Sequence, residues 1–428
     1  MTQRTQRTQR TQRTQRTQRT QRTRRALGIL SAVLLPAVAV AGCSAADGPG
    51  KSAPARLGRS SAPAPSSAAG PTAAPAASAG SGKGFTLVAS GDVLPHTSVI
   101  SQGAADAGGD GYDFRPMFSG VKPVVSAADL ALCHMETVYG EEDGPFSGYP
   151  AFTSPPQIAA GLKDAGYDGC STASNHTLDD GAEGIKRTLD AFDKAGLKHA
   201  GSARSAAEAA TPTVYTAGSA KVAHLAYTFD TNGYPMPEGR PWAVNLMREE
   251  KIVADARAAR KAGADVVLVS LHWGTEWQTE PDETQLSLGK ALTASRTGGR
   301  PDIDLILGTH AHIPQAYEKV NGTWIIYGMG DQVAGQMFNH SGAEDPRGGY
   351  GSIGRFTFAP PAAAGQRWRV TKAEYIPQWM DRGAGRVVNL SEGLERHPDR
   401  EDYETASEAI SEAVLSRGAA KDGLTQGT

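Results

Sequence analysis

Side chains that can bind a divalent metal stand at the ends of several short apolar runs that are expected to be strands. Two are carboxylates, one is an amide and four are imidazoles: Asp92, Glu136, Asn175, His176, His272, His310 and His312. Ligands of open α/β sheets bind outside the carboxyl ends of the strands, so we expect these side chains to meet at one rim. Carboxylate oxygen and imidazole nitrogen are ligands that Mn²⁺, Fe²⁺ and Zn²⁺ accept. The pattern therefore predicts a site for up to two divalent ions.

A single histidine at a strand end is usually held by a backbone carbonyl and binds no metal. Here, however, four of the ten histidines fall in three strand-end motifs: Ser174-Asn175-His176, Leu271-His272-Trp273 and Gly308-Thr309-His310-Ala311-His312. The ordinary explanation would have to hold for all four histidines at once. The metal site is therefore favoured over it.

The segments 91–96, 134–138, 174–190, 271–277 and 308–318 resemble the ordered motifs of the CapA/poly-γ-glutamate capsule-synthesis family, which belongs to the calcineurin-like metallophosphatase superfamily. The most specific stretch runs from Ala173 to Gly181, and the resemblance covers roughly residues 85–335. It implies an α/β fold, namely the layered α-β-β-α sandwich of metallophosphatases. The metal site is then expected at the carboxyl ends of the strands.

The resemblance also implies a role for each side chain: Asp92 and His312 at the first metal position, Glu136 bridging both, and Asn175, His272 and His310 at the second. His176 is then not a ligand. It donates a proton to the leaving group or holds the transition-state oxyanion. The implied reaction is hydrolysis by a metal-bound water, because two ions lower the pKa of that water and hold both oxygens of an in-line displacement.

Three positions depart from the pattern of the superfamily or of the family. Leu94 stands where phosphatases of the superfamily have the histidine of Asp-x-His, a loss that CapA-like proteins share. The first metal position is therefore one ligand short, and two ions should bind in unequal steps. His134 replaces the usual Asn ahead of Glu136, either as a hydrogen-bond donor that supports the ligands or as a ligand itself. Asp331 replaces the Asn of the closing loop that begins at Tyr327, and the sequence offers no interpretation of this change.

Four further residues belong to the motif segments without a fixed role. His96 lies two residues beyond Leu94 and is expected to be a solvent-exposed loop residue, with substitution for the missing ligand as the alternative. The other three either support the ligands from outside the metal site or have a role that the sequence does not assign: Glu276, Gln315 and Glu318.

The elements that must position these residues alternate between strand-like and helical patterns, which is typical of a layered α/β fold. Apolar runs predict strands over 85–89, 129–133, 266–269, 303–307 and 324–327. One helix is expected to begin at Asp179 or Asp180, because Ile185, Leu189 and Phe192 then share a face. A second helix is expected over about 249–262, and Gly263 suits the position after its end.

The N-terminal part of the chain has a composition that predicts export. Residues 2–22 are Thr-Gln-Arg repeats, either a basic leader or the product of a start codon placed too far upstream. An apolar stretch over 26–41 ends in Val40-Ala41-Gly42-Cys43, which resembles a lipoprotein cleavage box with Cys43 as the lipidated residue. Residues 1–43 are therefore interpreted as leader and signal peptide, and the Ala, Pro, Ser and Gly of 44–84 as a disordered tether. Residues 85–380 are assigned to the CapA-like domain and 381–428 to an acidic C-terminal tail.

Charge and cysteine content limit the partners and the chemistry. Residues 1–42 carry nine of the 43 basic residues and none of the 45 acidic ones, so the remaining chain has a net charge of about −11. This charge argues against nucleic acid as a partner. Beyond Cys43 the cysteines are Cys133 and Cys170, and their apolar surroundings favour buried thiols over a disulfide.

These observations predict a protein anchored by lipid to the extracytoplasmic face of the cell membrane. Its expected partners are an anionic surface polymer or its precursor, together with other capsule-synthesis membrane proteins. The favoured function is a dinuclear metal-dependent hydrolase of a phosphate ester or an amide-linked polymer. The alternative is a polymer-binding or export factor that needs metal without turning the polymer over, and a structural lipoprotein with a degenerate site is the third interpretation.

Overall fold

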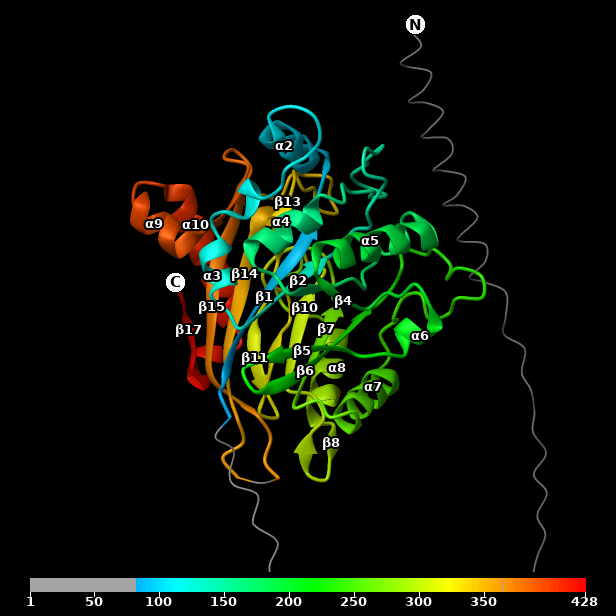
Figure 1. Ribbon diagram of the computed structural model, residues 1–428. Coiled ribbons are helices and arrows are strands. Elements are labelled where there is room, and N and C mark those ends of the chain that lie inside the picture. Colours follow the sequence, from blue (N-terminus) through cyan, green and yellow to red (C-terminus); the bar gives the residue numbers. More distant parts are fainter. Residues whose placement is uncertain (1–81, 364) are drawn as a thin grey trace, which may run out of the picture. The chain divides into compact units, whose positions relative to one another are not determined.

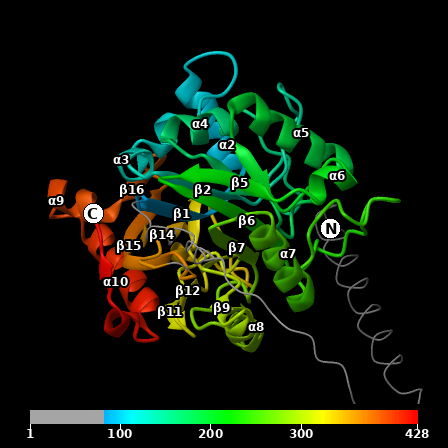
Figure 2. The ribbon, with the colours of Figure 1, turned by 60° about the horizontal axis from the view of Figure 1, so that its bottom comes forward.

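Two β-sheets packed face to face, each covered by helices on its outer side, form the part of the chain that the computed structural model describes, residues 82–363 and 365–428 (Figures 1 and 2). The predicted α-β-β-α layering is confirmed. The predicted leader, the cleavage box with Cys43 and the tether up to residue 81 lie outside the described residues. Among the described residues, none of the helices is both long enough and apolar enough to cross a bilayer.

The first sheet has the strand order β16-β15-β14-β1-β2-β3-β4, with β13 beside β1 and β17 beside β15. The bounds of its strands are β1 Phe85–Leu94, β2 Leu130–Met135, β3 Gly169–Ser171, β4 Lys198–Ala200, β13 Asp331–Ala334, β14 Tyr350–Ala359, β15 Arg369–Asp381, β16 Arg386–Asn389 and β17 Leu424–Gln426. The strands β1 to β4 run parallel, so their carboxyl ends lie at one edge. β1 pairs with β14 over its first half and with β13 over its second half.

Helices cover the outer face of the first sheet: α2 Thr97–Ala107, α3 Lys122–Ser126, α4 Ile158–Ala165 and α5 Gly181–Ala195. Val88 and Ala131 of the sheet pack there against Leu162 and Phe192 of the helices. The helix predicted after Asp180 is confirmed as α5, and its predicted apolar residues Ile185, Leu189 and Phe192 are buried.

The second sheet has the order β11-β12-β10-β7-β6-β5. Its strands are β5 Thr213–Ala217, β6 Ala220–Thr228, β7 Val266–His272, β10 Leu305–Thr309, β11 Tyr317–Val320 and β12 Thr323–Ile326. Its outer face is covered by α7 Glu249–Lys261 and α8 Glu283–Ala294, while α6 Ala206–Ala209 lies between β4 and β5 in the sequence. A small ribbon of β8 Arg296–Thr297 and β9 Arg300–Pro301 follows α8, and 3-10 turns occupy Pro116–Phe118, Pro346–Gly349 and Ala419–Asp422.

The predicted second helix is confirmed as α7. Gly263 lies just after it with φ 98°, and its N–H donates to the carbonyl of Arg260. A residue with a side chain would be strained in this left-handed conformation, so glycine suits the helix end.

The main core lies between the two sheets. Alternate residues of β1 and β2, such as Leu87 and Leu132, meet alternate residues of β7 and β10, such as Leu268 and Leu307. This alternation follows from the period of two residues along a strand. The opposite residues of the same strands face the helices, so both faces of each sheet are buried.

The C-terminal residues 381–428 belong to the domain, so the predicted boundary at 380 is not a domain boundary. α9 Leu390–Arg396 and α10 Glu401–Leu415 lie beside β14 and β15 (Figure 1). Tyr403, Ile410 and Val414 of α10 are buried in the core between the sheets, and β17 pairs with β15. The acidic composition of this segment misled the prediction, because its charges lie on the exposed face of α10.

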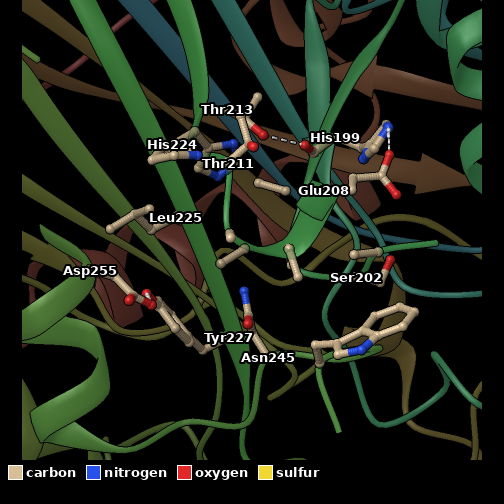
Figure 3. Close-up of a pocket in the computed structure, with 18 of the residues that line it drawn as sticks. His199, Ser202, Glu208, Thr211, Thr213, His224, Leu225, Tyr227, Asn245 and Asp255 are labelled. Atoms are coloured by element: carbon tan, nitrogen blue, oxygen red, sulfur yellow. Dashed lines mark hydrogen bonds and ion pairs between the residues drawn. The ribbon is translucent and has the colours of Figure 1, made fainter. Parts of the chain in front are cut away.

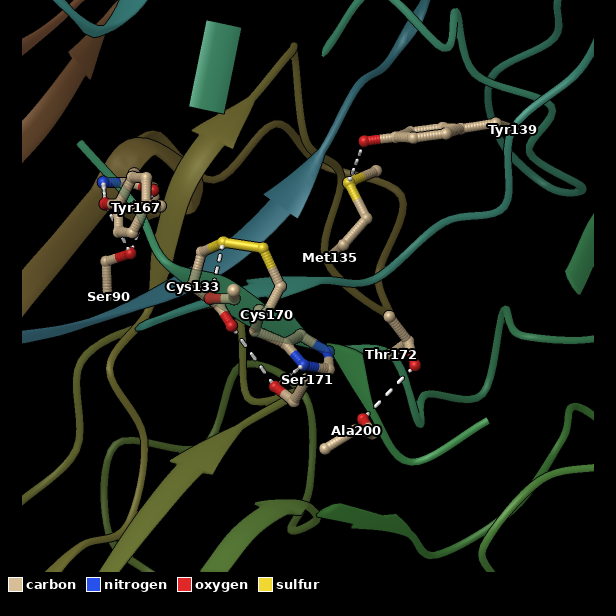
Figure 4. Close-up of a disulfide and its surroundings, with 12 residues drawn as sticks. Ser90, Cys133, Met135, Tyr139, Tyr167, Cys170, Ser171, Thr172 and Ala200 are labelled. Carbon is tan, nitrogen blue, oxygen red and sulfur yellow. Dashed lines mark hydrogen bonds between the residues drawn. A yellow bond between two sulfur atoms is a disulfide. The ribbon is translucent and has the colours of Figure 1, made fainter. Parts of the chain in front are cut away.

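The prediction of free thiols at Cys133 and Cys170 is wrong, because the structure joins them in a disulfide (Figure 4). They lie directly opposite each other in the parallel pair β2 and β3, with their Cα atoms 4.4 Å apart. A sequence shows neither the neighbourhood nor the register of two strands separated by 37 residues. Burial of both residues was predicted and is confirmed.

Candidate metal centre

The strand-end residues singled out by the sequence lie together, and both sheets contribute to the cluster. Asp92 lies near the end of β1, Glu136 follows β2, Asn175 and His176 follow β3, His272 ends β7, and His310 and His312 follow β10. Asp331, the first residue of β13, lies beside Asp92. Three groups of side chains each have ligand atoms within 4.8 Å of one another: Asp92, His134 and His272; Glu136, His310 and His312; Asp92, His312 and Asp331.

The residues of this cluster fit divalent ions because several of their ligand atoms have no other use. Within the cluster, six buried atoms have no hydrogen-bond partner among the described residues: Asp92 Oδ1, His134 Nε2, Glu136 Oε1 and Oε2, His310 Nδ1 and Asp331 Oδ2. A buried polar atom without a partner costs about 1–3 kcal/mol, and more if it is charged. Coordination of metal ions would satisfy these atoms together.

Burial and mutual repulsion alter the pKa values of the carboxyl groups in the metal-free cluster. Burial, followed by the charge of Asp331, raises the pKa of Asp92 to about 8. Burial and then Asp92 raise the pKa of Glu136 well above its usual value, and burial raises the pKa of Asp331 to about 6. Without a cation, the site therefore holds protons that an arriving cation must displace.

The imidazoles divide into two classes. Burial and neighbouring histidines lower the pKa of His272 and that of His310 well below the usual value, so both rings are neutral and suitable as metal ligands. Burial also acts to lower the pKa of His312, but Asp331 and Glu136 outweigh it and raise that pKa.

The predicted second metal position has its members in contact. His272 Nε2 lies 2.9 Å from Asn175 Oδ1, and His272 Nδ1 lies 3.0 Å from Thr309 Oγ1. The rings of His272 and His310 are 4.6 Å apart. Thr309 thus fixes the orientation of the His272 ring from the neighbouring strand.

The loop that carries His310 and His312 has an unusual backbone. Both residues have positive φ, 92° and 61°. Such conformations are uncommon for residues other than glycine, and they concentrate at functional sites. The N–H of His310 donates to Asp92 Oδ2 over 3.1 Å, so this backbone conformation also helps to hold the carboxylate.

His176 lies next to the cluster but is absent from its three metal groups in the described part of the chain. Its Nδ1 is 2.6 Å from Asp179 Oδ2, and its ring packs edge-on against Phe152. It lines a cleft of about 720 Å³, together with Leu94, Trp277 and His312. Sequence reasoning missed Asp179 as a functional residue, although the His-x-x-Asp spacing could have indicated it.

The remaining predicted residues fall in different places. His134 Nδ1 is 2.7 Å from Ser171 Oγ, while its Nε2 faces Asp92 Oδ1 at 3.7 Å. Glu276 lies at the rim of the cleft. His96 is half-buried rather than exposed, and its Nδ1 lies 3.0 Å from the carbonyl oxygen of Leu94 and 3.2 Å from the amide nitrogen of Gly335.

Gln315 and Glu318 lie away from the metal cluster, so their predicted supporting role is not seen. Gln315 accepts a hydrogen bond from the Gln285 side chain and donates one to the carbonyl of Gln278. Glu318 on β11 accepts from the Tyr327 hydroxyl and from Arg417. These hydrogen bonds all go to residues outside the metal cluster.

A second cavity, of about 650 Å³, lies between the edges of the two sheets (Figure 3). His224 and Tyr227 of β6 line one side, and His199 and Ser202 line the other. The residues predicted to form the metal site are not among those that line it.

Comparisons with known proteins agree with the sequence motifs. The family model described as "Bacterial capsule synthesis protein PGA_cap" matches residues 86–336. The "PGA biosynthesis protein CapA" of Bacillus subtilis (strain 168) is 30% identical over 176 residues, which are 41% of this chain and 44% of that protein. The "Capsule biosynthesis protein CapA" of Bacillus anthracis is 28% identical over 179 residues, 41% of this chain and 42% of that protein. The chain thus spans less than half the length of these two relatives.

Two solved structures match the chain at low sequence identity, a phosphatase and a putative 5'-nucleotidase. A phosphatase from Mycoplasma pneumoniae has a TM-score of 0.41 and 15% identity, covering 69% of this chain and 94% of that chain. A putative 5'-nucleotidase from Staphylococcus aureus has a TM-score of 0.43 and 15% identity, covering 68% of this chain and 54% of that chain.

Proposed function

The chain belongs to the bacterial capsule synthesis protein family PGA_cap, and from this premise we propose that it is a divalent-metal-dependent hydrolase acting in the synthesis of an anionic surface polymer. The proposed bond is a phosphate ester or an amide of a polymer such as poly-γ-glutamate. The relatives named for capsule and poly-γ-glutamate biosynthesis support the polymer class.

One observation carries the hydrolase proposal: buried ligand atoms without hydrogen-bond partners in the described residues lie beside an open cleft. Asp92, Glu136, Asn175, His272, His310 and His312 would hold the ions. Divalent ions bound there would supply Lewis acidity to a phosphoryl or carbonyl oxygen and to water.

His176 is the proposed proton donor to the leaving group. Asp179 accepts a hydrogen bond from Nδ1 of this ring, which leaves Nε2 as the nitrogen that exchanges a proton with a substrate. A buried carboxylate behind an imidazole fixes the orientation and the tautomer of the ring. The Asp179 oxygen is itself held by the N–H of Phe152, over 2.7 Å.

The cleft lining agrees with a substrate whose charge is met by metal ions. Among the described residues that line it, none is Lys or Arg, while Tyr149, Phe152, Trp277 and Phe338 contribute aromatic surface. An anionic group would therefore find its positive partner at the metal centre. The aromatic walls would contact the uncharged parts of the same molecule.

We also propose that the protein is exported and held at the outer face of the cell membrane through lipidated Cys43. The cleavage-box sequence motivates this assignment. The disulfide between Cys133 and Cys170 supports it, since disulfides persist in oxidising compartments outside the cytoplasm.

The direct test is metal analysis of the purified full-length protein, followed by assays on phosphodiester, phosphomonoester and γ-glutamyl substrates. Turnover of one of these classes, abolished by a chelator and restored by Mn²⁺ or Zn²⁺, is the expected result. Metal-dependent binding of an anionic polymer without turnover of any bond would instead establish the binding or export factor. Absence of metal binding would contradict both functions.

A further inference from the structure

We infer that Asp331 is a metal ligand at the first position, where it supplies the coordination that Leu94 cannot provide. The inference rests on the proposed metal centre and changes its composition. The first position then contains Asp92, Glu136, His312 and Asp331, and it is no longer the poorer of the two. Two tight binding steps follow, in place of the unequal steps that the sequence predicts.

The pairing of strands brings the two aspartates together. β13 runs parallel to β1, and Asp331 is the register partner of Asp92. The register shifts immediately after this pair, because Val93 is opposite Val333. The two aspartates are thus the last pair before the irregularity. Asp92, His312 and Asp331 consequently have ligand atoms within 4.8 Å of one another, all of them buried.

The contact between Asp331 and His312 is compatible with two interpretations. Asp331 Oδ1 lies 3.0 Å from His312 Nδ1, which is a hydrogen-bond distance. Two ligands that are each about 2.1 Å from one ion and at right angles to each other also lie about 3 Å apart. The first interpretation makes Asp331 a positioning residue for the His312 ring, and the second makes both residues ligands.

The second oxygen of Asp331 favours the ligand interpretation. Asp331 Oδ2 is buried and has no hydrogen-bond partner in the described part of the chain. A residue that only orients His312 needs one acceptor, and the Asn usual in the family at this place provides it. An aspartate adds a second buried oxygen and a charge, both of which are costly unless a cation binds them.

The charge of the cluster points in the same direction. Asp92, Glu136 and Asp331 place three carboxyl groups in one buried volume, and in the described residues their ion pairs are formed with imidazoles alone. With the imidazoles neutral, as metal ligands must be, one divalent ion cannot neutralise three carboxylates, whereas two ions can. The third carboxylate therefore matches a fully occupied second ion rather than a weakly held one.

Leu94 lies where an alternative ligand could replace Asp331. It follows Asp92 by two residues on β1, so both side chains lie on the same face of the strand. Leu94 lines the cleft together with His312 and packs against Phe152 and Met337. A histidine at this place would restore the Asp-x-His pattern next to the position that Asp331 serves.

The test is calorimetric titration of purified full-length protein with Mn²⁺ and with Zn²⁺, for the wild type, Asp331→Asn and Leu94→His/Asp331→Asn. Asn keeps an acceptor for His312 but loses the anionic ligand. We expect Asp331→Asn to weaken one of two tight steps by at least about 10-fold, the lower end of the effect of residues that merely support ligands. The double variant should regain the lost step, because a new imidazole replaces the missing oxygen. Asp381→Asn, at a buried aspartate on β15 that bonds to Tyr403, is the matched control and should keep both steps.

A second measurement on the wild type keeps the inference testable if a variant does not fold. In crystals soaked with Zn²⁺, the anomalous signal should place an ion with an Asp331 oxygen at about 2.0–2.2 Å. Two bound ions with both Asp331 oxygens beyond contact, or unchanged titration of Asp331→Asn, would overturn the inference and leave the proposed function intact. Failure of the wild type to bind either metal would overturn both.

Discussion

His176 lies beside the proposed metal ligands and outside the three groups that could bind metal in the described residues, and its ring is held from behind by Asp179. Replacing His176 by Asn should leave the metal content and thermal midpoint unchanged and lower turnover by about 10²–10⁴-fold, the usual contribution of general acid–base catalysis. Metal analysis and turnover of the identified substrate, measured on the same preparation, check this prediction.

His397→Asn provides the matched control for the His176 substitution, since His397 is exposed and follows α9. It should change neither metal content nor turnover. Loss of metal from the His176 variant would make this residue a ligand and contradict the proposed proton transfer.

The carboxyl groups of the metal-free centre predict an unusual pH dependence of stability. The pKa of Asp92, raised by burial and by Asp331 to about 8, lies far above its unfolded value of 3.8. The folded state therefore binds more protons than the unfolded state between these two values, and the free energy of unfolding falls as pH rises. Histidines with lowered pKa values, such as His134 and His272, act in the opposite direction, but only up to about their usual pKa of 6.5.

We accordingly expect the thermal midpoint of chelator-treated protein to decrease between pH 7 and pH 8. Differential scanning calorimetry at several pH values checks this, and Asp92→Asn should make the decrease smaller. A midpoint that rises over the same pH interval would show that Asp92 is already ionised in the metal-free fold.

At the scale of single residues, the sequence predicted which side chains gather at the candidate metal centre, because most of them follow an apolar run that is recognisable as a strand. It could not predict what Asp331 does, since that depends on the register of β13 against β1. It also grouped Gln315 and Glu318 with the site because they share a motif with His310. In the structure, Gln315 accepts a hydrogen bond from Gln285, and Glu318 accepts one from Tyr327.

Helix α10 contributes to the hydrophobic core, although the acidic composition of its segment predicted a tail. Replacing Ile410, which is fully buried between α10 and the sheets, by Ala should lower the free energy of unfolding by about 2–5 kcal/mol. Glu408→Ala on the exposed face of the same helix is the control and should change it little. Denaturant unfolding monitored by circular dichroism measures both. If Ile410→Ala has the stability of the wild type, residues 381–428 do not contribute to the stability of the domain, as the predicted tail would not.

At the scale of elements, local patterns were sufficient for α5, α7 and the central strands, because periodicity and end signals lie within each segment. The pairing of these elements was beyond reach of the same reasoning. Cys133 and Cys170 illustrate this. Their burial could be inferred from their apolar surroundings, but their disulfide could not, because it depends on the pairing and register of β2 and β3.

For the whole molecule, the proposed anchor makes a prediction about location. Cys43→Ala should leave the protein soluble or as an unprocessed precursor, because the thiol that would accept the lipid is gone. Membrane fractionation and mass spectrometry of the N-terminal peptide check this, and Cys133→Ala/Cys170→Ala is the control that should remain in the membrane fraction. Unmodified wild-type protein recovered from the cytoplasm would contradict the proposed export.

The position of β1 at the centre of the first sheet has a consequence for the order in which the protein is made. Asp92 is among the first parts of the domain to be synthesised, yet the amide that holds it belongs to His310, 218 residues later, and Asp331 follows later still. If Asp331 is a ligand as inferred, the nascent chain cannot bind an ion with all of its ligands until β13 has left the ribosome. Pairings over such distances form slowly. A chain that crosses the membrane before it folds takes its ions from the surroundings, where the metals available to the folding chain decide which of them is captured. The identity of the ion in the purified protein would then indicate the compartment in which the chain folded.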